Sequence, residues 1–211
     1  SKGPLDFVTN SDKKVEKILI EELTKSRKKF SILSEEIGEI KNSDKDNCWI
    51  IDPIDGTTNF LHGIPHFAIS IALRNRQEIV SGLIFDPIKN EMFYAEKNGG
   101  AYFNNQRIRV SKKRNLNECL FATGGKDQFN KDLNVRKSGS AALDMAYVGA
   151  GRYDGYFQKN LNIWDIAAGI IIVNEAGGKV NDIEYFSNKL INIFAGSNSI
   201  YEKMLKNLNN F

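Results

Sequence analysis

Two aspartates at the end of an apolar stretch are the strongest chemical signal in this chain. In the segment W-I-I-D-P-I-D-G-T-T-N-F, Asp52 and Asp55 stand three residues apart, Pro53 fixes the backbone between them, and Gly56 lets the backbone approach a ligand closely. Carboxylate oxygens so placed suit magnesium, and the amides after Gly56 would face an anion if they open a helix. A turn in which both aspartates only cap backbone amides is the alternative interpretation.

A second acidic motif, W-D-I-A-A-G, begins at Trp164. The segment 166–175 is apolar almost all round and precedes two glycines, which predicts a buried helix with a glycine stop. Asp165 would lie in the first turn, where an aspartate is often only favourable to the helix dipole. The small residues of the motif would, however, let the helix pack tightly on a strand. Asp165 would then bring a third carboxylate to a shared cation.

Two further acidic positions are ambiguous on their residues alone. Glu35 and Glu36 form a pair in a loop, where such a pair is commonly plain surface charge. Thr9 and Asp12 resemble a capping box that opens an amphipathic helix running to about Lys28, and a helix cap is a sufficient role for Asp12.

The order of predicted elements is mixed α/β. Alternating apolar residues and turn signals between Phe67 and Phe103 predict an antiparallel meander. The other predicted strands cover 30–33, 48–51, 120–123 and 153–157, and the other helix covers 140–148. The acidic motifs follow directly on two of these strands, 30–33 and 48–51.

Composition is that of a soluble globular protein. The 211 residues are 41% hydrophobic and 26% charged, with a net charge of +3 and two cysteines. No segment has the apolar length of a membrane span, and the N-terminus lacks the apolar run of a secretory signal. We expect a cytoplasmic protein without membrane contact, built as one domain over 1–211 with a metal-binding half of about 1–115 and a second half of about 116–211.

The two acidic motifs together closely resemble the inositol monophosphatase family. The resemblance extends through the G-P-L-D-F-V-T segment that begins at Gly3, the Ser34-Glu35-Glu36 loop, residues 135–144 and residues 151–155, and so covers most of the chain. The same superfamily contains fructose-1,6-bisphosphatases and 3′-phosphoadenosine 5′-phosphate phosphatases. The resemblance implies an alternating layered α-β-α-β-α sandwich and a phosphatase acting on inositol 1-phosphate or a related small phosphorylated metabolite.

The resemblance also implies a cofactor of two or three Mg²⁺ ions. Glu35, Asp52 and the carbonyl of Ile54 would hold one ion, and Asp52, Asp55 and Asp165 a second. A metal-activated water would attack phosphorus in line, without a covalent intermediate.

Catalytic and substrate-binding roles follow from the same resemblance. Thr57 and Glu35 would orient the attacking water, and Asp12 would polarise the Thr57 hydroxyl. At Ser140 a helix N-cap is an equally good interpretation and is compatible with substrate contact. The implied substrate contacts are Ile54, Asp55, Gly56, Thr57, Gly139, Ser140, Ala141, Gln158 and Asp165.

The sequence departs from the family pattern in three places. Gln158 stands where a glutamate usually hydrogen-bonds substrate hydroxyls, so we expect loosened selectivity. The chain begins where the family would already have completed an N-terminal helix, and the segment from Gly124 to Asn134 is short. Missing residues would account for both shortenings, and a natural miniature is the other interpretation.

Three further expectations come from the family. We expect lithium to inhibit the enzyme and the chain to form a homodimer. We also expect association with RNA polymerase, in a scaffold role with or without catalysis. A haloacid-dehalogenase phosphatase is disfavoured, because its nucleophilic aspartate would fall at Pro53. A nucleotide 3′-phosphatase would need a basic and aromatic pocket for adenosine, which cannot be placed near the motifs.

Overall fold

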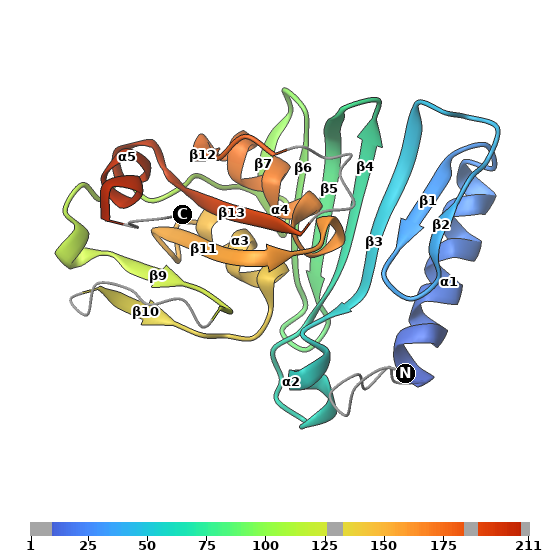
Figure 1. The fold of residues 1–211 in the computed structure, drawn as a ribbon, viewed down its shortest axis with the longest axis horizontal. Helices are drawn as coiled ribbons and strands as arrows, with labels where there is room; N and C mark the ends of the chain where they lie inside the picture. Colours follow the sequence, from blue (N-terminus) through green and yellow to red (C-terminus); the bar gives the residue numbers. More distant parts are fainter. Residues whose placement is uncertain (1–9, 126–132, 184–189, 208–211) are drawn as a thin grey trace.

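Two β-sheets face each other across a pair of helices. The structure is a computed structural model that describes residues 10–125, 133–183 and 190–207. Figure 1 shows the layers in order: helix α1, the larger sheet, helices α3 and α4, the smaller sheet, and helix α5. The alternating layered sandwich expected from the sequence is therefore confirmed.

The larger sheet has eight strands in the order β2-β1-β3-β4-β5-β6-β7-β8. The predicted meander is confirmed as the antiparallel strands β4 to β7. β1 and β3 run parallel, with Ser34 beside Ile51, so both deliver their carboxyl ends to the same edge of the sheet. The strands are β1 (Ser31–Ser34), β2 (Gly38–Ile40), β3 (Asn47–Asp55), β4 (Ala68–Asn75), β5 (Glu78–Asp86), β6 (Glu91–Glu96), β7 (Gly100–Phe103) and β8 (Gln106–Arg107).

The smaller sheet has the strand order β10-β9-β11-β13-β12. Its central strands β11 and β13 are antiparallel, with Gln158 opposite Ile193. The strands are β9 (Leu120–Ala122), β10 (Asn134–Arg136), β11 (Gly155–Leu161), β12 (Gly178–Val180) and β13 (Ile191–Ser197).

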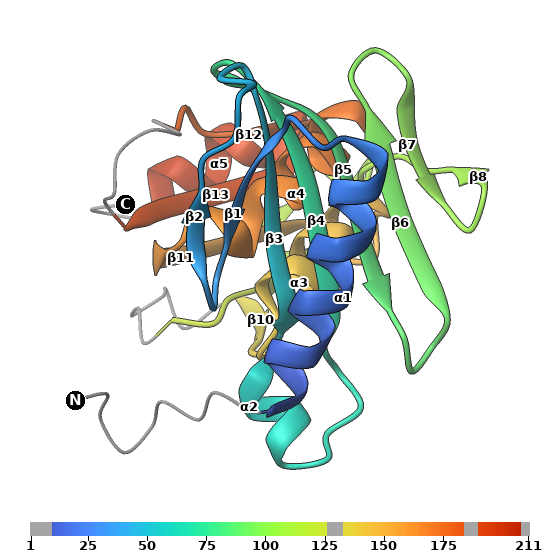
Figure 2. The same ribbon diagram turned by 90° about the vertical axis from the view of Figure 1, so that its right-hand side faces the viewer.

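Helices cover both outer faces and fill the space between the sheets. Figure 2 shows α1 lying across the outer face of the larger sheet. None of the helices within the described ranges is long and apolar enough to cross a membrane. The helices are α1 (Asn10–Ser26), α2 (Thr57–Leu61), the short 3₁₀ helix η1 (Leu116–Glu118), α3 (Ala141–Gly149), α4 (Ile163–Glu175) and α5 (Asn198–Asn207).

Helix α4 is the centre of the core, as its all-round apolar pattern predicts. Its residues 166–173 are buried. A Cβ added at Gly82 of β5 would lie 2.8 Å from Cα of Ala168, and one added at Gly169 would lie 2.5 Å from Cβ of Met145 on α3. The small residues of the W-D-I-A-A-G motif therefore allow α4 to touch the sheet and α3 at once.

Several boundaries differ from the sequence expectations. β3 continues through both aspartates to Asp55 instead of ending at Ile51, because a bulge accommodates Pro53. β11 begins at Gly155 and runs to Leu161, and the pairing of β2, β10, β12 and β13, like helix α5, was not predicted. β2, β10 and β12 have three residues each, too few to show a period. The capping box expected at the start of α1 involves Thr9, which lies outside the described residues.

Candidate active site

One cavity of about 320 Å³ gathers nearly all the residues expected to act. It lies where the ends of β3, α3, α4 and β11 meet. Asp12 is the expected site residue that does not line it. The expected residues that do are Glu35, Asp52, Ile54, Asp55, Gly56, Thr57, Gly139, Ser140, Ala141, Gln158 and Asp165.

A bulge in β3 turns both aspartates of the first motif into this cavity. Three residue steps from Asp52 to Asp55 face two steps on β4, from Ser70 to Ala68. In a regular strand, residues three apart point to opposite faces, and the extra residue cancels that alternation. Proline is tolerated at such a bulge because it has no amide to contribute to the ladder. The D-P-x-D spacing therefore presents two carboxylates on one side.

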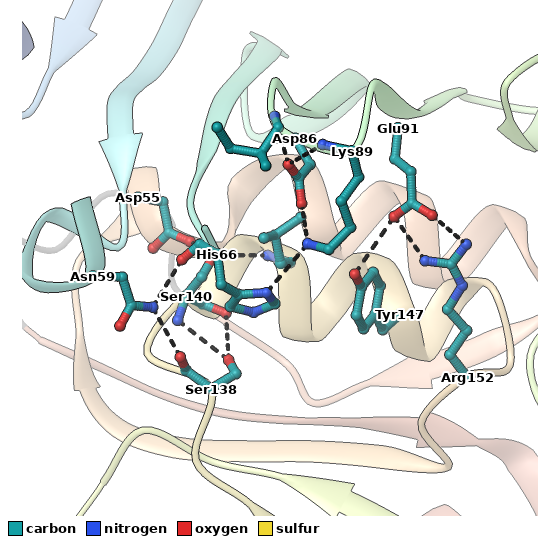
Figure 3. A network of polar contacts seen from close by, with 12 residues as sticks. Asp55, Asn59, His66, Asp86, Lys89, Glu91, Ser138, Ser140, Tyr147 and Arg152 are labelled. Atoms are coloured by element: carbon teal, nitrogen blue, oxygen red, sulfur yellow. Dashed lines mark hydrogen bonds and ion pairs between the residues drawn. The ribbon is translucent and has the colours of Figure 1, made fainter. Parts of the chain in front are cut away.

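Asp55 ties β3 to the first turn of α3. Its carboxylate accepts hydrogen bonds from the hydroxyl of Ser140 (Figure 3) and from the amides of Ala141 at 3.2 Å and Ala142 at 2.9 Å. The hydroxyl of Ser140 also caps α3 by accepting from the amide of Leu143 at 3.3 Å. The predicted N-cap role is confirmed, and the same residue lines the cavity.

Asp165 likewise combines a capping contact with a place in the cavity. Its Oδ2 accepts from the amide of Asn162 at 2.8 Å, at the start of α4. This contact is the helix-terminal role that the sequence left open. Because Asp165 also lines the cavity, the capping bond holds its carboxyl in the site.

Helix α2 begins directly after β3, as expected if the amides following Gly56 open a helix. Gly56 has φ 99°, and an added Cβ would lie 3.2 Å from the carbonyl oxygens of both Gly139 and His66. Only glycine meets both demands without strain. The Thr57 hydroxyl donates to the carbonyl of Ile54 at 3.0 Å.

Acidic groups in the cavity hold protons more tightly than isolated carboxyls do. Burial first, and then the charge of Asp55, raises the pKa of Asp165 to about 8. Burial raises the pKa of Asp55 to about 6 in spite of its hydrogen bonds, and the same cause raises the pKa of Asp52 well above its usual range. The site therefore carries more negative charge than it can stabilise alone.

Glu35 occupies the mouth of the cavity. The residue as a whole is exposed, but its carboxyl turns toward Asp52 and loses part of its solvent. That desolvation, followed by the charge of Glu36, raises the pKa of Glu35 to about 7. Asp12 is buried in the first turn of α1, and its charge contributes to the same shift.

The donor set fits a hard divalent cation. Five carboxyl residues line the cavity together with Ile54, and none of the lining residues is basic. Among the described residues, no three acidic, histidine or cysteine side chains already form a complete ligand set. Each of the lining carboxyls has a hydrogen-bond partner within the protein.

Gln158 reaches the cavity with its amide oxygen engaged. The hydroxyl of Tyr156 donates to Oε1 of Gln158 at 2.7 Å. A Cβ added at Gly124 would lie 2.2 Å from the same oxygen, so a side chain at position 124 would displace the end of Gln158. The amide nitrogen of Gln158, and the second lone pair of its oxygen, remain to face a ligand.

Sequence reasoning missed three residues that shape the site. Asp144 lines the cavity and accepts from the hydroxyl of Ser138 at 2.7 Å, and burial raises its pKa to about 8. The side-chain amide of Asn59 donates to the carbonyls of His66 at 2.8 Å and Ser138 at 2.9 Å (Figure 3). Both residues stand inside recognised motifs, which was the available signal.

The third is Glu16, a buried glutamate on α1 whose carboxylate binds the loop that carries Glu35. It follows Asp12 by one helical turn, and a polar residue on the apolar face of a helix was the only signal for it.

Known proteins resemble this chain over almost all of its length. A sequence model described as the inositol monophosphatase family matches residues 1–208. An inositol-1-monophosphatase of Caulobacter vibrioides is 42% identical over 98% of this chain and 89% of its own. A Nus factor SuhB of Escherichia coli strain K12 is 43% identical over 98% of this chain and 84% of its own.

Solved structures give the same result for the fold. The extragenic suppressor protein suhB from Bartonella henselae superimposes with a TM-score of 0.91 at 46% identity, covering 99% of this chain and 87% of that one. An IMPase from Thermotoga maritima superimposes with a TM-score of 0.90 at 41% identity, covering 99% of this chain and 85% of that one.

Proposed function

The chain belongs to the inositol monophosphatase family, and on this premise we propose that it hydrolyses inositol 1-phosphate or a related small polyol phosphate with the help of Mg²⁺. The observation that carries the proposal is a single pocket in which five carboxyls meet Gly56 and Thr57 without a basic residue. A phosphate dianion would be repelled by such a pocket unless cations intervened. The carboxyls that would repel the phosphate in the absence of cations are therefore the groups that would hold the ions.

Glu35, Asp52, Asp55, Asp165 and the carbonyl of Ile54 would hold two or three Mg²⁺ ions. Bound there, magnesium supplies positive charge for the phosphate and acidifies the attacking water.

The remaining tasks belong to the groups around these ligands. The amides of Gly56 and Thr57 donate to the phosphate at the point where α2 begins. Thr57 and Glu35 orient the water, and Asp12 orients Thr57. Residues 139–141 and Gln158, which line the same cavity, face the alcohol part of the substrate. Asp55 joins residues 141 and 142 to the metal-binding group through its bonds to the amides of Ala141 and Ala142.

The test measures phosphate release from inositol 1-phosphate by metal-stripped protein, before and after Mg²⁺ is restored. We expect turnover only with the ion and none in Asp52→Asn. Asp46→Asn, the same change at an exposed aspartate paired with Arg76, is the matched control and should retain full activity. Turnover in excess chelator, or an Asp52→Asn protein as active as the control, would overturn the proposal.

A substrate panel separates the members of the superfamily. We expect inositol 1-phosphate and glycerol 2-phosphate to be cleaved faster than fructose 1,6-bisphosphate or 3′-phosphoadenosine 5′-phosphate. The reverse order of rates would leave the assignment as a phosphatase in place and would reject a polyol phosphate as the substrate. High lithium should inhibit the reaction, and uninhibited turnover would count against the inositol phosphatase branch.

The second candidate function is a scaffold role in association with RNA polymerase, beside catalysis. It is favoured by the relatives named Nus factor SuhB, which are 42% and 43% identical to this chain. We expect the protein to co-purify with RNA polymerase both as the wild type and as Asp52→Asn. Absence of the polymerase from both preparations would reject the scaffold role and leave the phosphatase untouched.

A further inference from the structure

A second cavity lies at the far end of α4 from the acidic pocket. It has a volume of about 450 Å³ and is bordered by residues 109–112 and 114, by Ala176 and Gly177 after α4, and by Asn198 at the start of α5. Asp165 lies in the first turn of α4, so a rise of 1.5 Å per residue separates the two cavities by about 17 Å along the helix. The helices nearest to them, α2 and α5, lie well apart in Figures 1 and 2.

The charge of this second cavity is opposite to that of the first. Arg109, Lys112 and Arg114 line it, and none of its lining residues is acidic. Within the parts of the chain that the structure describes, none of the three forms an ion pair. Lys113, between them in sequence, pairs with the buried Asp154 at 3.0 Å. All three side chains are exposed, so solvent weakens their mutual repulsion, and a bound anion lowers what remains of it.

Capping of α4 does not account for the three cations. The carbonyl of Ala176 accepts from the backbone amide of Val110 at 3.2 Å, and the carbonyl of Gly177 accepts from the side-chain amide of Asn198 at 3.4 Å. These carbonyls at the end of α4 therefore have neutral partners already. The Arg109 guanidinium donates only locally among the described contacts, to the carbonyl of Ile108 at 2.9 Å.

Neutral hydrogen-bonding groups complete the lining. Ser197 and Ser199 border the cavity with their hydroxyl oxygens 3.5 Å apart, and Ser111 also lines it. The first turn of α5 adds backbone amides that have no partner within the helix and lie at the positive end of its dipole. Basic residues, serines and the first residues of α5 thus border one cavity.

We propose that this basic cavity binds the phosphate group of a small ligand, at a site separate from the acidic pocket. Two arginines offer planar pairs of donors that match phosphate oxygens, and the volume falls within the range of small-molecule sites. The proposal does not rest on the function assigned to the acidic pocket.

The test titrates inorganic phosphate and pyrophosphate into metal-stripped protein by calorimetry, because the acidic pocket without cations repels both anions. We expect one site whose affinity falls at least about tenfold in Arg109→Ala/Lys112→Ala/Arg114→Ala. The matched control is Lys14→Ala/Lys28→Ala/Lys45→Ala, which removes the same charge from exposed positions elsewhere and should bind as the wild type does.

A second variant places a carboxylate inside the cavity. Ser199→Glu puts an acid in the first turn of α5, where the dipole and the three cations favour it, so we expect a higher melting temperature together with lost phosphate binding. The magnesium-dependent turnover of both cavity variants should equal that of the wild type, which shows that they fold.

The proposal would be overturned if phosphate affinity fell equally in the two triple variants. It would also be overturned if chloride at the same ionic strength gave the same response as phosphate, because the effect would then be general charge screening. Single-stranded RNA is titrated in the same way as a third ligand. If it bound through Arg109, Lys112 and Arg114 while phosphate and pyrophosphate did not, the small-ligand proposal would be rejected in favour of a nucleic-acid surface.

Discussion

The carboxylate of Glu16 on α1 accepts a hydrogen bond from the backbone amide of Glu36 at 3.2 Å. The same oxygen accepts from the hydroxyl of Ser34 and from the amide of Ile37 at 3.3 Å. Three donors, at the end of β1 and in the loop that follows it, thus converge on a single buried side chain. Because these donors lie on both sides of Glu35 in the sequence, Glu16 anchors the backbone that carries the Glu35 carboxyl.

Replacement of Glu16 should therefore weaken metal binding without removing a ligand. We expect Glu16→Ala to raise the Mg²⁺ concentration for half-maximal turnover by about 10-fold, the usual effect of losing a group that orients a ligand. Glu16→Gln keeps an acceptor oxygen and should restore most of the affinity. Glu21→Ala, on the exposed side of the same helix, is the control. An unchanged Mg²⁺ requirement in Glu16→Ala would show that the loop holds itself in place.

Magnesium binding should release protons near neutral pH. In the metal-free fold the pKa of Glu35 is about 7 and that of Asp165 about 8, whereas a cation binds the ionised forms. Affinity should therefore rise between pH 6 and pH 8, by up to about tenfold per pH unit for each proton released. Calorimetry at pH 6.5 in two buffers of different ionisation enthalpy counts the protons. Equal affinities at pH 6 and pH 9 would contradict the shifts.

The metal-free protein should show the corresponding trend in stability. A carboxyl whose pKa is raised by folding is protonated in the folded chain while it is ionised in the unfolded chain, so the unfolded state binds fewer protons. The free energy of unfolding should fall as pH rises from about 4 to about 8. Urea melts of metal-stripped protein across that range measure it, and a rise in stability over the same range would refute the expectation.

Thr57 and Asp12 should act as one unit. Thr57→Ala and Asp12→Asn should each lower kcat with little change in KM, and the double variant should be little worse than either. The contact of Thr57 with the carbonyl of Ile54 offers the competing account, in which the hydroxyl serves only the turn. Strict additivity in the double-mutant cycle would favour that account and leave Asp12 as a structural group of α1.

Gln158 should set how strongly the enzyme prefers inositol 1-phosphate over glycerol 2-phosphate. Its Oε1 already accepts from Tyr156, so the amide offers the substrate a donor and no charged acceptor. Gln158→Glu should raise the ratio of the two kcat/KM values by about 5- to 10-fold, the size expected for one charged hydrogen bond. The ratio is measured in both proteins. If it does not change, Gln158 does not contact the alcohol part of the substrate.

Local patterns in the sequence were sufficient for the elements that repeat a regular period. The meander follows from alternation between turn residues, and its turns place Arg76 and Asn98 at φ 53° and 63°. The burial of α4 follows from an apolar surface on every side. The two acidic motifs were recognisable because residue type and spacing are properties of a short segment.

Only the tertiary structure decided how these segments combine. The bulge that turns Asp52 and Asp55 to one side depends on the register of β4, which no local pattern specifies. Asp55 and Ser140 meet across 85 positions, and Asn59 reaches Ser138 across 79. A period encodes the direction in which a side chain leaves its own backbone, whereas a contact between distant segments depends on how both pack against a shared core. The motifs of the acidic pocket were therefore visible in the sequence, while Glu16, which positions its loop, and the basic cavity beyond α4 were not.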